Sequence, residues 1–291
     1  MPQRRAKIGV IGGTGLYEIE GMTNIENVYL DTPFGKPSDS LTIGKLNGVG
    51  IAFLPRHGRE HRIQPGDVPA RANIYALKTI GVERIIAVNS CGSFKEELKP
   101  GSLLIPDQVI DRTRGRISTF FGDGVVAHVS FADPFCPELS RILYGCAREA
   151  GADVHQNGTY ISMEGPAFST RAESRLYKSW GGDVIGMTII PEAKLAREAE
   201  ICYASVCAVT DYDSWREKEQ GVTADVITGY MKHNIAMAKT IIKLAAGEIS
   251  DSRNCDCGTA LKYAIITAPA VMTLEQKKKF DLLIGKYLEK K

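Results

Sequence analysis

The sequence predicts an α/β fold, because short apolar runs alternate along the chain with segments of helical periodicity. The apolar runs are rich in β-branched residues, as buried strands are. With 291 residues, the chain is long enough for one large domain or two small ones, with a substantial core. The predicted strands are Lys7–Ile11, Gly50–Leu54, Arg84–Asn89, Ser102–Pro106, Ile201–Val209 and a further candidate, Tyr263–Thr267.

Four segments combine helical periodicity with a start or stop signal. They are Val68–Ile80 with Gly81 as its C-cap, a helix opened by the capping box Thr170-x-x-Glu173, a helix from Pro191 through Glu192–Ala199, and Ala224–Ala246 stopped by Gly247. The apolar face of the last helix is expected to pack in the core rather than to bind a cofactor.

The C-terminal part of the chain differs from the rest. Residues 248–258 are polar and predict a linker, and Thr273-x-x-Gln276 is a second capping box that opens a helix. Forty residues rarely form a core alone. We therefore expect one domain over residues 1–250 and a C-terminal extension, residues 251–291, docked on that domain.

The composition is that of a soluble globular enzyme, with 44% hydrophobic and 24% charged residues. The net charge of +2, from 36 basic and 34 acidic residues, is too balanced to indicate a nucleic acid or a membrane surface as partner. No apolar run approaches the ~20 residues that span a bilayer. The apolar run after Arg4-Arg5 is too short and too rich in glycine for a signal peptide. These features predict a cytoplasmic protein.

Seven cysteines, an odd number, argue against a secreted disulfide scaffold. The tight pair Cys255-x-Cys257 is a weak zinc signal, because no nearby histidine or second pair completes four ligands. We therefore predict no metal site and favour redox or structural pairing of these thiols.

The most informative motif is the apolar run 204–210, which ends in Asp211-Tyr212-Asp213. Residues two apart on a strand share a face, so both carboxylates are expected to point the same way. In an open α/β sheet, this end of the strands is where ligands bind. Two crowded carboxylates cannot both ionise easily, so one pKa should rise and give a proton donor. The alternative is a pair of ordinary loop aspartates.

Two loops that follow predicted strands are candidate anion sites. Gly12–Gly15 exposes backbone N–H groups. It is not a dinucleotide fingerprint, whose third glycine would fall at Glu18, and it lacks the Gly-Lys-Ser/Thr of a Walker A loop. Arg56–Arg59 offers guanidinium groups that match phosphate oxygens. A tight turn and a solvated basic loop are the respective alternatives.

Three further loops carry small, polar or aromatic residues that suit a ligand. Phe168 can stack on a flat ring, and Thr188 and the Met187 backbone can meet hydroxyls or phosphate. Cys91 has no partner base fixed by the sequence, so a small filler is a better interpretation than a nucleophile. Together these features indicate phosphate plus a nucleoside-like substrate. The loops are Asn89–Ser93, Met163–Ser169 and Gly186–Glu192.

Six motifs occur in unbroken order between roughly residues 7 and 245. They are Gly12–Gly15, Asp31–Ser38, Arg56–Arg59, Glu164–Ser169, Met187-Thr188 and Thr210-Asp211-Tyr212-Asp213-x-Trp215. This set closely resembles the methylthioadenosine phosphorylases, which belong to the trimeric branch of the purine nucleoside phosphorylases. The resemblance implies a single-domain, three-layer α/β/α fold around a mixed, partly barrel-like sheet.

The resemblance also implies a set of site residues. The phosphate site would comprise Thr14, Arg56, His57, Asn89, Ser90 and Thr188. The nucleoside site would comprise Phe168 on the base, Met187 at the ribose hydroxyls, Ile185, Ala224 and Ile227 as apolar neighbours, Asp211 and Asp213 at the purine edge, and His128 from a neighbouring subunit.

The reaction implied by the resemblance is phosphorolysis of 5′-methylthioadenosine to adenine and 5-methylthioribose 1-phosphate. Protonated Asp211 would donate to the purine N7 and Asp213 would accept from the 6-amino group, with Asp211 and Ser169 favouring 6-amino purines. Inorganic phosphate would be a co-substrate, without a metal or another cofactor. A homotrimer, or a dimer of trimers, is the expected assembly.

Three alternatives stay open at this point. The enzyme could be a broad 6-aminopurine nucleoside phosphorylase that accepts adenosine equally. From a different class, it could be an NAD-dependent oxidoreductase or a nucleotide-binding module that uses the Gly12–Gly15 turn. A bridge between Cys136 and Cys202 is a further alternative for the cysteines.

Overall fold

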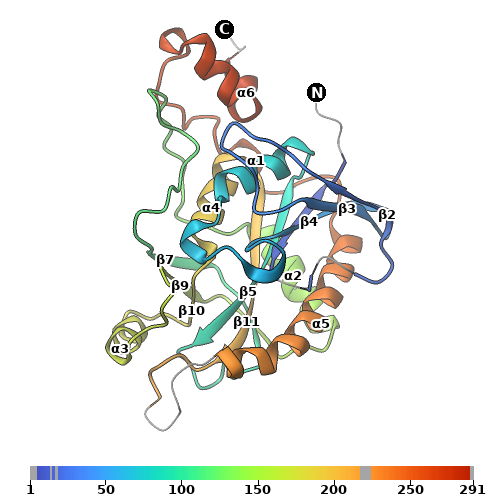
Figure 1. The fold of residues 1–291 in the computed structure, drawn as a ribbon, viewed down its shortest axis with the longest axis vertical. Coiled ribbons are helices and arrows are strands. Elements are labelled where there is room, and N and C mark those ends of the chain that lie inside the picture. Colours follow the sequence, from blue (N-terminus) through green and yellow to red (C-terminus); the bar gives the residue numbers. More distant parts are fainter. Residues whose placement is uncertain (1–4, 14, 17–18, 217–223, 289–291) are drawn as a thin grey trace.

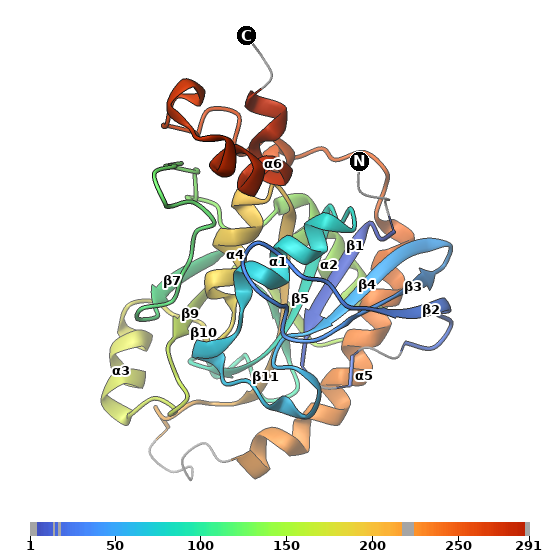
Figure 2. The ribbon, with the colours of Figure 1, turned by 45° about the horizontal axis from the view of Figure 1, so that its top comes forward.

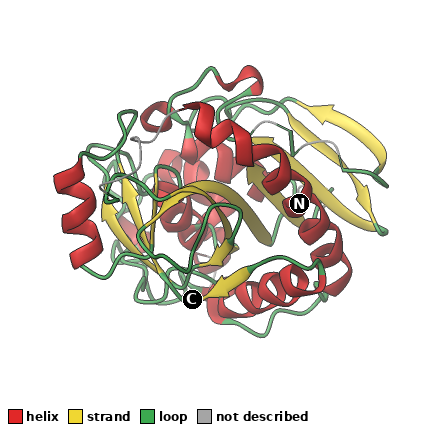
Figure 3. Ribbon diagram, turned by 90° about the horizontal axis from the view of Figure 1, so that it is seen from below, coloured by secondary structure: helices red, strands yellow, loops and turns green. Residues whose placement is uncertain are grey.

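The computed structural model describes residues 5–13, 15–16, 19–216 and 224–288, with the backbone alone described at 224–229 and 231. Its described part forms one mixed sheet with helices on both faces (Figures 1 and 3). The strands are β1 (Ile8–Gly12), β2 (Thr23–Val28), β3 (Leu41–Leu46), β4 (Val49–Pro55), β5 (Arg84–Ser93), β6 (Leu103–Ile105), β7 (Gln108–Arg112), β8 (Val154–Gln156), β9 (Thr159–Met163), β10 (Val184–Gly186) and β11 (Cys202–Asp211). The α-helices are α1 (Ala70–Thr79), α2 (Pro137–Glu149), α3 (Arg171–Ser179), α4 (Ile189–Glu198), α5 (Ala224–Glu248) and α6 (Leu274–Leu288).

The long strand β5 is the branch point of the sheet. It pairs in parallel with β1 on one side and with β11 on the other, and its last two residues pair antiparallel with β10. One arm continues through β10, β9 and β7, and the other through β11, β6 and β8. Residues 106–107 connect β6 to β7, and residues 157–158 connect β8 to β9, so the two arms approach each other again. The mixed, partly barrel-like sheet is confirmed.

The central strands are buried on both faces. All ten residues of β11 are buried, and they alternate between two cores. Tyr203 and Cys207 pack with α1 and α4, whereas Ala204 and Val206 pack with α2 and α5. A strand covered on both faces has no polar face, which explains its continuous apolar sequence. This arrangement is the three-layer fold that the sequence predicts.

Five of the predicted strands are confirmed, as β1, β4, β5, β6 and β11, although β5 runs to Ser93. The sixth, Tyr263–Thr267, is wrong. This segment forms an isolated bridge between Ile265 and Ala127, and further backbone hydrogen bonds join it to Val126 and His128 of the same loop. Because that partner is itself irregular, no ladder propagates.

The helix signals are confirmed with two adjustments. Ile190 has extended backbone angles inside α4, so the regular helix begins at Pro191 as predicted. Gly247 does not stop α5, which ends at Glu248. No helix in the described part of the chain has both the length and the apolar composition needed to cross a membrane. Both capping boxes form, Thr170 with Glu173 before α3 and Thr273 with Gln276 before α6.

The C-terminal segment packs on the main body, and α6 lies beside α1 and α4 in both views (Figures 1 and 2). Leu261 and Phe280 are fully buried in the core cluster that contains α1 and α4. The carboxylate of buried Glu200 accepts hydrogen bonds from the Leu261 N–H at 3.0 Å and the Tyr287 hydroxyl at 2.5 Å. The segment thus shares its core with the main body, and the division of the chain at residue 250 stays a prediction.

Candidate active site

A cavity of about 590 Å³ opens at the carboxyl ends of β5 and β11. Ligands of α/β proteins generally bind at this edge of the sheet, so the cavity lies where the sequence predicts a site. The cavity collects residues from loops that are far apart in the sequence. Nine of the predicted site residues line it: Arg56, His57, Ser90, Phe168, Ile185, Met187, Thr188, Asp211 and Asp213.

The other five predicted residues are placed differently. Asn89 is buried beside the cavity and contacts it through Thr188. His128 is exposed on the loop that follows β7, where its N–H donates to the Ala264 carbonyl at 2.8 Å, and it does not line the cavity of its own chain. Thr14 and the side chains of Ala224 and Ile227 lie outside the described residues.

The two carboxylates lie together, each about 8% exposed, but not because they share a strand face. Strand β11 ends at Asp211, and Asp213 has a left-handed φ of 47°. Its N–H donates to Asp211 Oδ1 at 2.8 Å, while the Thr210 hydroxyl donates to Oδ2 at 2.7 Å. A turn closed by a side chain therefore forms the pair, and the prediction from strand alternation is wrong in its cause.

Asp213 is the carboxyl whose pKa the structure raises. Burial is the main cause, and the negative charge of Asp211 raises this pKa further. The hydroxyl of Ser174, on α3, donates to Asp213 Oδ2 and opposes the rise. The net effect favours the protonated form of Asp213.

Gly92 makes room for this pair. It lies opposite Asp211 across the β5–β11 ladder. A Cβ atom at this position would approach Asp211 Oδ1 to 2.7 Å and Asp213 Cβ to 3.1 Å. The sequence predicts that the small residues here suit a ligand, whereas in the structure the absence of a side chain at Gly92 makes room for the two carboxylates.

We expect Gly92→Ala to reduce kcat by roughly 10²-fold, because the added methyl group displaces the Asp211 carboxylate by a fraction of an ångström or more. Steady-state kinetics with the nucleoside substrate measure this loss. The matched control is Gly145→Ala on α2, where nothing lies within 4 Å of the added Cβ. Equal kinetics for the two variants would contradict the steric argument.

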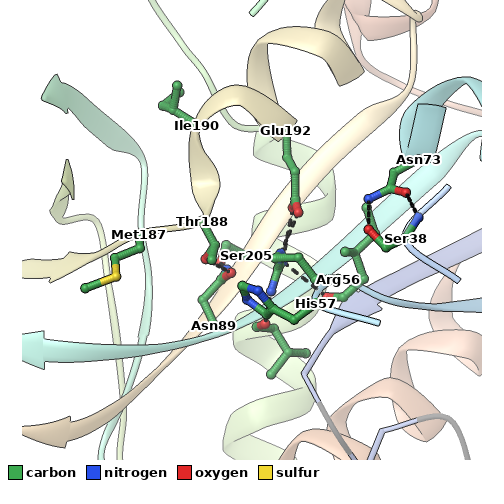
Figure 4. Close-up of polar contacts among 12 residues, drawn as sticks. Ser38, Arg56, His57, Asn73, Asn89, Met187, Thr188, Ile190, Glu192 and Ser205 are labelled. Atoms are coloured by element: carbon green, nitrogen blue, oxygen red, sulfur yellow. Dashed lines mark hydrogen bonds and ion pairs between the residues drawn. The ribbon is translucent and has the colours of Figure 1, made fainter. Parts of the chain in front are cut away.

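Arg56, predicted as a phosphate ligand, is buried and paired with a carboxylate of its own chain. Its Nε donates to Glu192 Oε1 at 2.5 Å and its Nη2 donates to Glu192 Oε2 at 3.0 Å (Figure 4). Other N–H groups donate to the carbonyls of Val88 and Ile11. Among the described residues, four of the five guanidinium N–H groups thus have acceptors, which leaves one for a ligand. Glu192 follows Pro191 in a motif already singled out, but the sequence did not show its partner.

His57 completes the same wall of the cavity as a neutral ring. Burial and the charge of Arg56 lower its pKa to about 4. Its Nδ1 lies 2.8 Å from the Ile63 carbonyl oxygen, which can only accept, so Nδ1 carries the proton. The Nε2 atom is then an acceptor, suited to a protonated phosphate oxygen. The ring stacks on His61 with centroids 4.4 Å apart.

Asn89 orients Thr188 instead of lining the cavity. The Thr188 hydroxyl donates to Asn89 Oδ1 at 2.6 Å, and Asn89 Nδ2 donates to Ser205 Oγ at 2.6 Å (Figure 4). These two hydrogen bonds link the loop before α4 to strands β5 and β11. The predicted phosphate ligand Asn89 is thus a support for Thr188 in this structure.

Arg116 fastens the two loops on the nucleoside side of the cavity. Its Nη1 donates to the carbonyls of Met187 at 2.6 Å and Ile190 at 2.9 Å, and its Nε pairs with Glu164 Oε1 at 3.0 Å. Phe168, in the loop after Glu164, is 45% exposed, so its ring is available to a flat ligand. The sequence carried no signal for Arg116, because all of its partners are distant in the chain.

Cys91 lines the cavity but is a poor nucleophile. Burial raises the pKa of its thiol well above the ordinary value, and the neighbouring Cys207 raises it further. This supports its interpretation as a small filler.

Comparison with known proteins gives the family. A model of the Phosphorylase superfamily matches residues 7–244. The S-methyl-5′-thioadenosine phosphorylase of Geobacter sulfurreducens is 58% identical over 282 residues, which cover 97% of this chain and 99% of that protein. The chain belongs to the S-methyl-5′-thioadenosine phosphorylase family. The resemblance predicted from six motifs is confirmed.

Solved structures of this family share the fold. A methylthioadenosine phosphorylase from an antarctic soil metagenomic library has a TM-score of 0.92 and 49% identity, covering 97% of this chain and 99% of that chain. A mutant of the adenosine/methylthioadenosine phosphorylase of Schistosoma mansoni, in complex with adenine, has a TM-score of 0.80 and 36% identity, covering 85% and 93%. These matches confirm the phosphorylase fold of this family member.

Proposed function

We propose that this protein transfers the methylthioribosyl group of 5′-methylthioadenosine to inorganic phosphate, releasing adenine and 5-methylthioribose 1-phosphate. One observation carries the proposal: a single cavity holds two adjacent carboxyl groups, an available aromatic ring, and a buried guanidinium beside hydroxyl and imidazole groups. Its volume of about 590 Å³ suits a nucleoside together with phosphate. The activity named for the 58% identical relative supports the same reaction.

Phosphate would bind between Arg56, Thr188, Ser90 and His57, with Thr14 as the further contact that the family resemblance implies. Glu192 offsets most of the Arg56 charge, so the site relies on hydrogen-bond donors and on one acceptor, His57 Nε2. This combination favours monoprotonated phosphate, whose hydroxyl donates to His57 while its other oxygens accept. Phosphate held below C1′ is both the nucleophile and the partner of the positive charge that develops on the ribose.

The purine would lie between Phe168 and the carboxyl pair. As the glycosidic bond breaks, electron density moves onto the base, and a proton delivered to N7 lets adenine leave neutral. Adenine presents an acceptor at N7 and a donor at its 6-amino group. Asp211 and Asp213 together, with one proton, present a donor and an acceptor to that edge. Burial raises the pKa of Asp213, which favours its protonated form over the form that two bare aspartates would adopt in water.

The decisive test is adenine release from 5′-methylthioadenosine with and without phosphate, followed by chromatography. We expect equal amounts of adenine and the sugar phosphate, and no adenine when phosphate is omitted. Phosphate-independent release would indicate hydrolysis and contradict the proposal. Faster cleavage of inosine would contradict the role of the carboxyl pair in selecting 6-amino purines.

A broader activity on adenosine is the second candidate. It is supported by the name of the Schistosoma mansoni relative, an adenosine/methylthioadenosine phosphorylase. The side chains of Ala224 and Ile227, which the resemblance places near the methylthio group, lie outside the described residues. The ratio of kcat/KM for methylthioadenosine and adenosine separates the two candidates.

The proposed assembly is a homotrimer or a dimer of trimers in the cytoplasm. His128 supports it, because this exposed residue lies outside the cavity of its own chain and is free to enter a neighbour's. All seven cysteines are described and none forms a disulfide, which fits a reducing compartment. Membership of the phosphorylase family disfavours the NAD-dependent oxidoreductase and the nucleotide-binding module.

A further inference from the structure

Four of the seven cysteines converge at one point, on the side of the sheet opposite α1 and α4. We call Cys136, Cys202, Cys255 and Cys257 the cysteine cluster. Their sulfur atoms all lie within 4.8 Å of one another. Cys136 precedes α2, and Cys202 is the first residue of β11. Cys255 and Cys257 belong to the C-terminal extension, residues 251–291.

We propose that the cysteine cluster binds one Zn²⁺ ion through four thiolates. A tetrahedral zinc ion with Zn–S bonds of about 2.3 Å separates its sulfur ligands by about 3.8 Å. The Cys255 sulfur lies 3.4 Å from that of Cys202 and 3.6 Å from that of Cys136, close to this spacing. Four sulfur ligands that can surround one ion select a soft metal such as zinc over calcium or magnesium, which prefer oxygen ligands.

The burial of the ligands matches a closed structural site. Cys136, Cys202 and Cys257 are buried, and Cys255 is partly exposed. Zinc binding forms four Zn–S bonds and releases the thiol protons to solvent, so no oxidant is needed. A second cavity of about 580 Å³ is lined by Cys255 and Cys257 and gives the ion a path from solvent.

The start of helix α2 favours a thiolate at one of the four ligands. Cys136 is the N-cap of the thirteen-residue helix α2, where the helix dipole stabilises a thiolate. Arg141 and Arg197 line the same cavity as Cys255 and Cys257, together with three acidic residues, Asp107, Asp133 and Asp256. The loop that carries Cys255 is held by the Asn254 N–H, which donates to Glu138 Oε2 at 3.0 Å.

The sequence alone predicts no metal site, because Cys255-x-Cys257 offers two ligands without a second pair nearby. The structure supplies the missing ligands from Cys202, 53 residues away from Cys255, and Cys136, 119 residues away. The ion would link the C-terminal extension to α2 and β11. No residue lines both this cavity and the candidate active site, so the ion would act on stability and not on the chemistry.

Metal analysis of the purified protein tests this proposal, with air excluded and neither metal nor chelator added. We expect about one zinc ion per chain in the unmodified protein and less than about one tenth of that in Cys255→Ser/Cys257→Ser. The matched control is Cys146→Ser, a buried cysteine of α2 outside the cluster, which should keep its zinc. Zinc that persists in the double variant, or iron in its place, would overturn the assignment.

Cobalt substitution provides a second measurement that needs no variant. After zinc removal, Co²⁺ should give the thiolate charge-transfer band and the strong visible bands of a tetrahedral sulfur site, and Zn²⁺ should abolish both. Four alkylatable thiols without these bands would refute the site. A mass lower by two or four hydrogens under non-reducing conditions would equally refute it, because it indicates disulfides.

Discussion

Replacing Asp213 by asparagine is expected to lower kcat by about 10²–10⁴-fold and, at neutral pH, to raise the melting temperature. The activity falls because asparagine keeps the hydrogen bonds of the pair but has no proton to transfer to the purine. The stability rises because burial and the charge of Asp211 disfavour the ionised carboxyl. This one substitution therefore tests both the free energy that the buried Asp213 carboxyl costs the fold and its contribution to catalysis.

The effect of Asp213 on stability depends on pH, and its direction follows from the raised pKa. The folded-state pKa of Asp213 lies above its unfolded value, so the folded protein binds more protons between the two. Asp213 thus lowers stability as pH rises through this window, and the asparagine variant escapes that loss. Its gain in melting temperature should disappear below about pH 4, where the carboxyl is protonated in both states. In the unmodified enzyme, kcat/KM should fall on the alkaline side as the pair loses its proton.

Asp153→Asn is the matched control, because this aspartate lies outside the cavity and its pKa is lowered, chiefly by the hydrogen bond from Ser102. It should leave kcat unchanged and lower the melting temperature at neutral pH. A destabilised Asp213→Asn, or one with near-normal kcat, would contradict the role given to Asp213.

Replacing Glu192 by glutamine should destabilise the phosphate-free protein by about 3–5 kcal/mol, as expected when one partner of a buried ion pair is removed. Arg56 is 2% exposed and Glu192 1%, so water reaches the unpaired charge only through the cavity and compensates little of it. Glutamine keeps the volume and one acceptor oxygen. The loss also affects the Tyr203 hydroxyl, which donates to Glu192 Oε2 at 3.0 Å.

Phosphate should restore part of this stability, because it would supply the missing negative charge beside Arg56. We therefore expect phosphate, compared with chloride at equal ionic strength, to raise the melting temperature more in Glu192→Gln than in the unmodified protein. Thermal unfolding with both salts measures the difference, and it tests the proposed contact between Arg56 and phosphate.

Glu198→Gln is the control within the same helix. Glu198 is also buried, but its carboxylate accepts from the Thr119 hydroxyl and the Phe120 N–H, and burial raises its pKa. Loss of its charge orphans no cation, so the change in stability should be small and indifferent to phosphate. Equal behaviour of the two variants would mean that the Arg56–Glu192 pair is not coupled to the phosphate site.

Several elements escaped the sequence analysis for a physical reason. Strands β8 and β10 have three residues each, and unlike the equally short β6, whose three residues are all apolar and buried, each includes a residue that is not apolar or not buried. Strand β2 is almost wholly exposed, so no apolar pattern marks it. Strand β3 and helix α2 were also missed, although both carry buried apolar residues. Local patterns identify elements that are long and half-buried or continuously apolar, and they overlook the rest.

The sequence by itself determined the α/β class, the five central strands, both capping boxes and the family, because these depend on local periodicity and on motifs in order. Through the family resemblance it also named nine residues of the cavity, and the rule that ligands bind where strands end placed Asp211 and Asp213 at this edge of the sheet. Only the tertiary structure decides which side chains pair with one another. Arg56 meets Glu192 across 136 residues, Asp213 meets Ser174 across 39, and Cys136 meets Cys255 across 119. Charge, proton affinity and metal binding depend on such neighbours, and packing brings them together where no local sequence signal does.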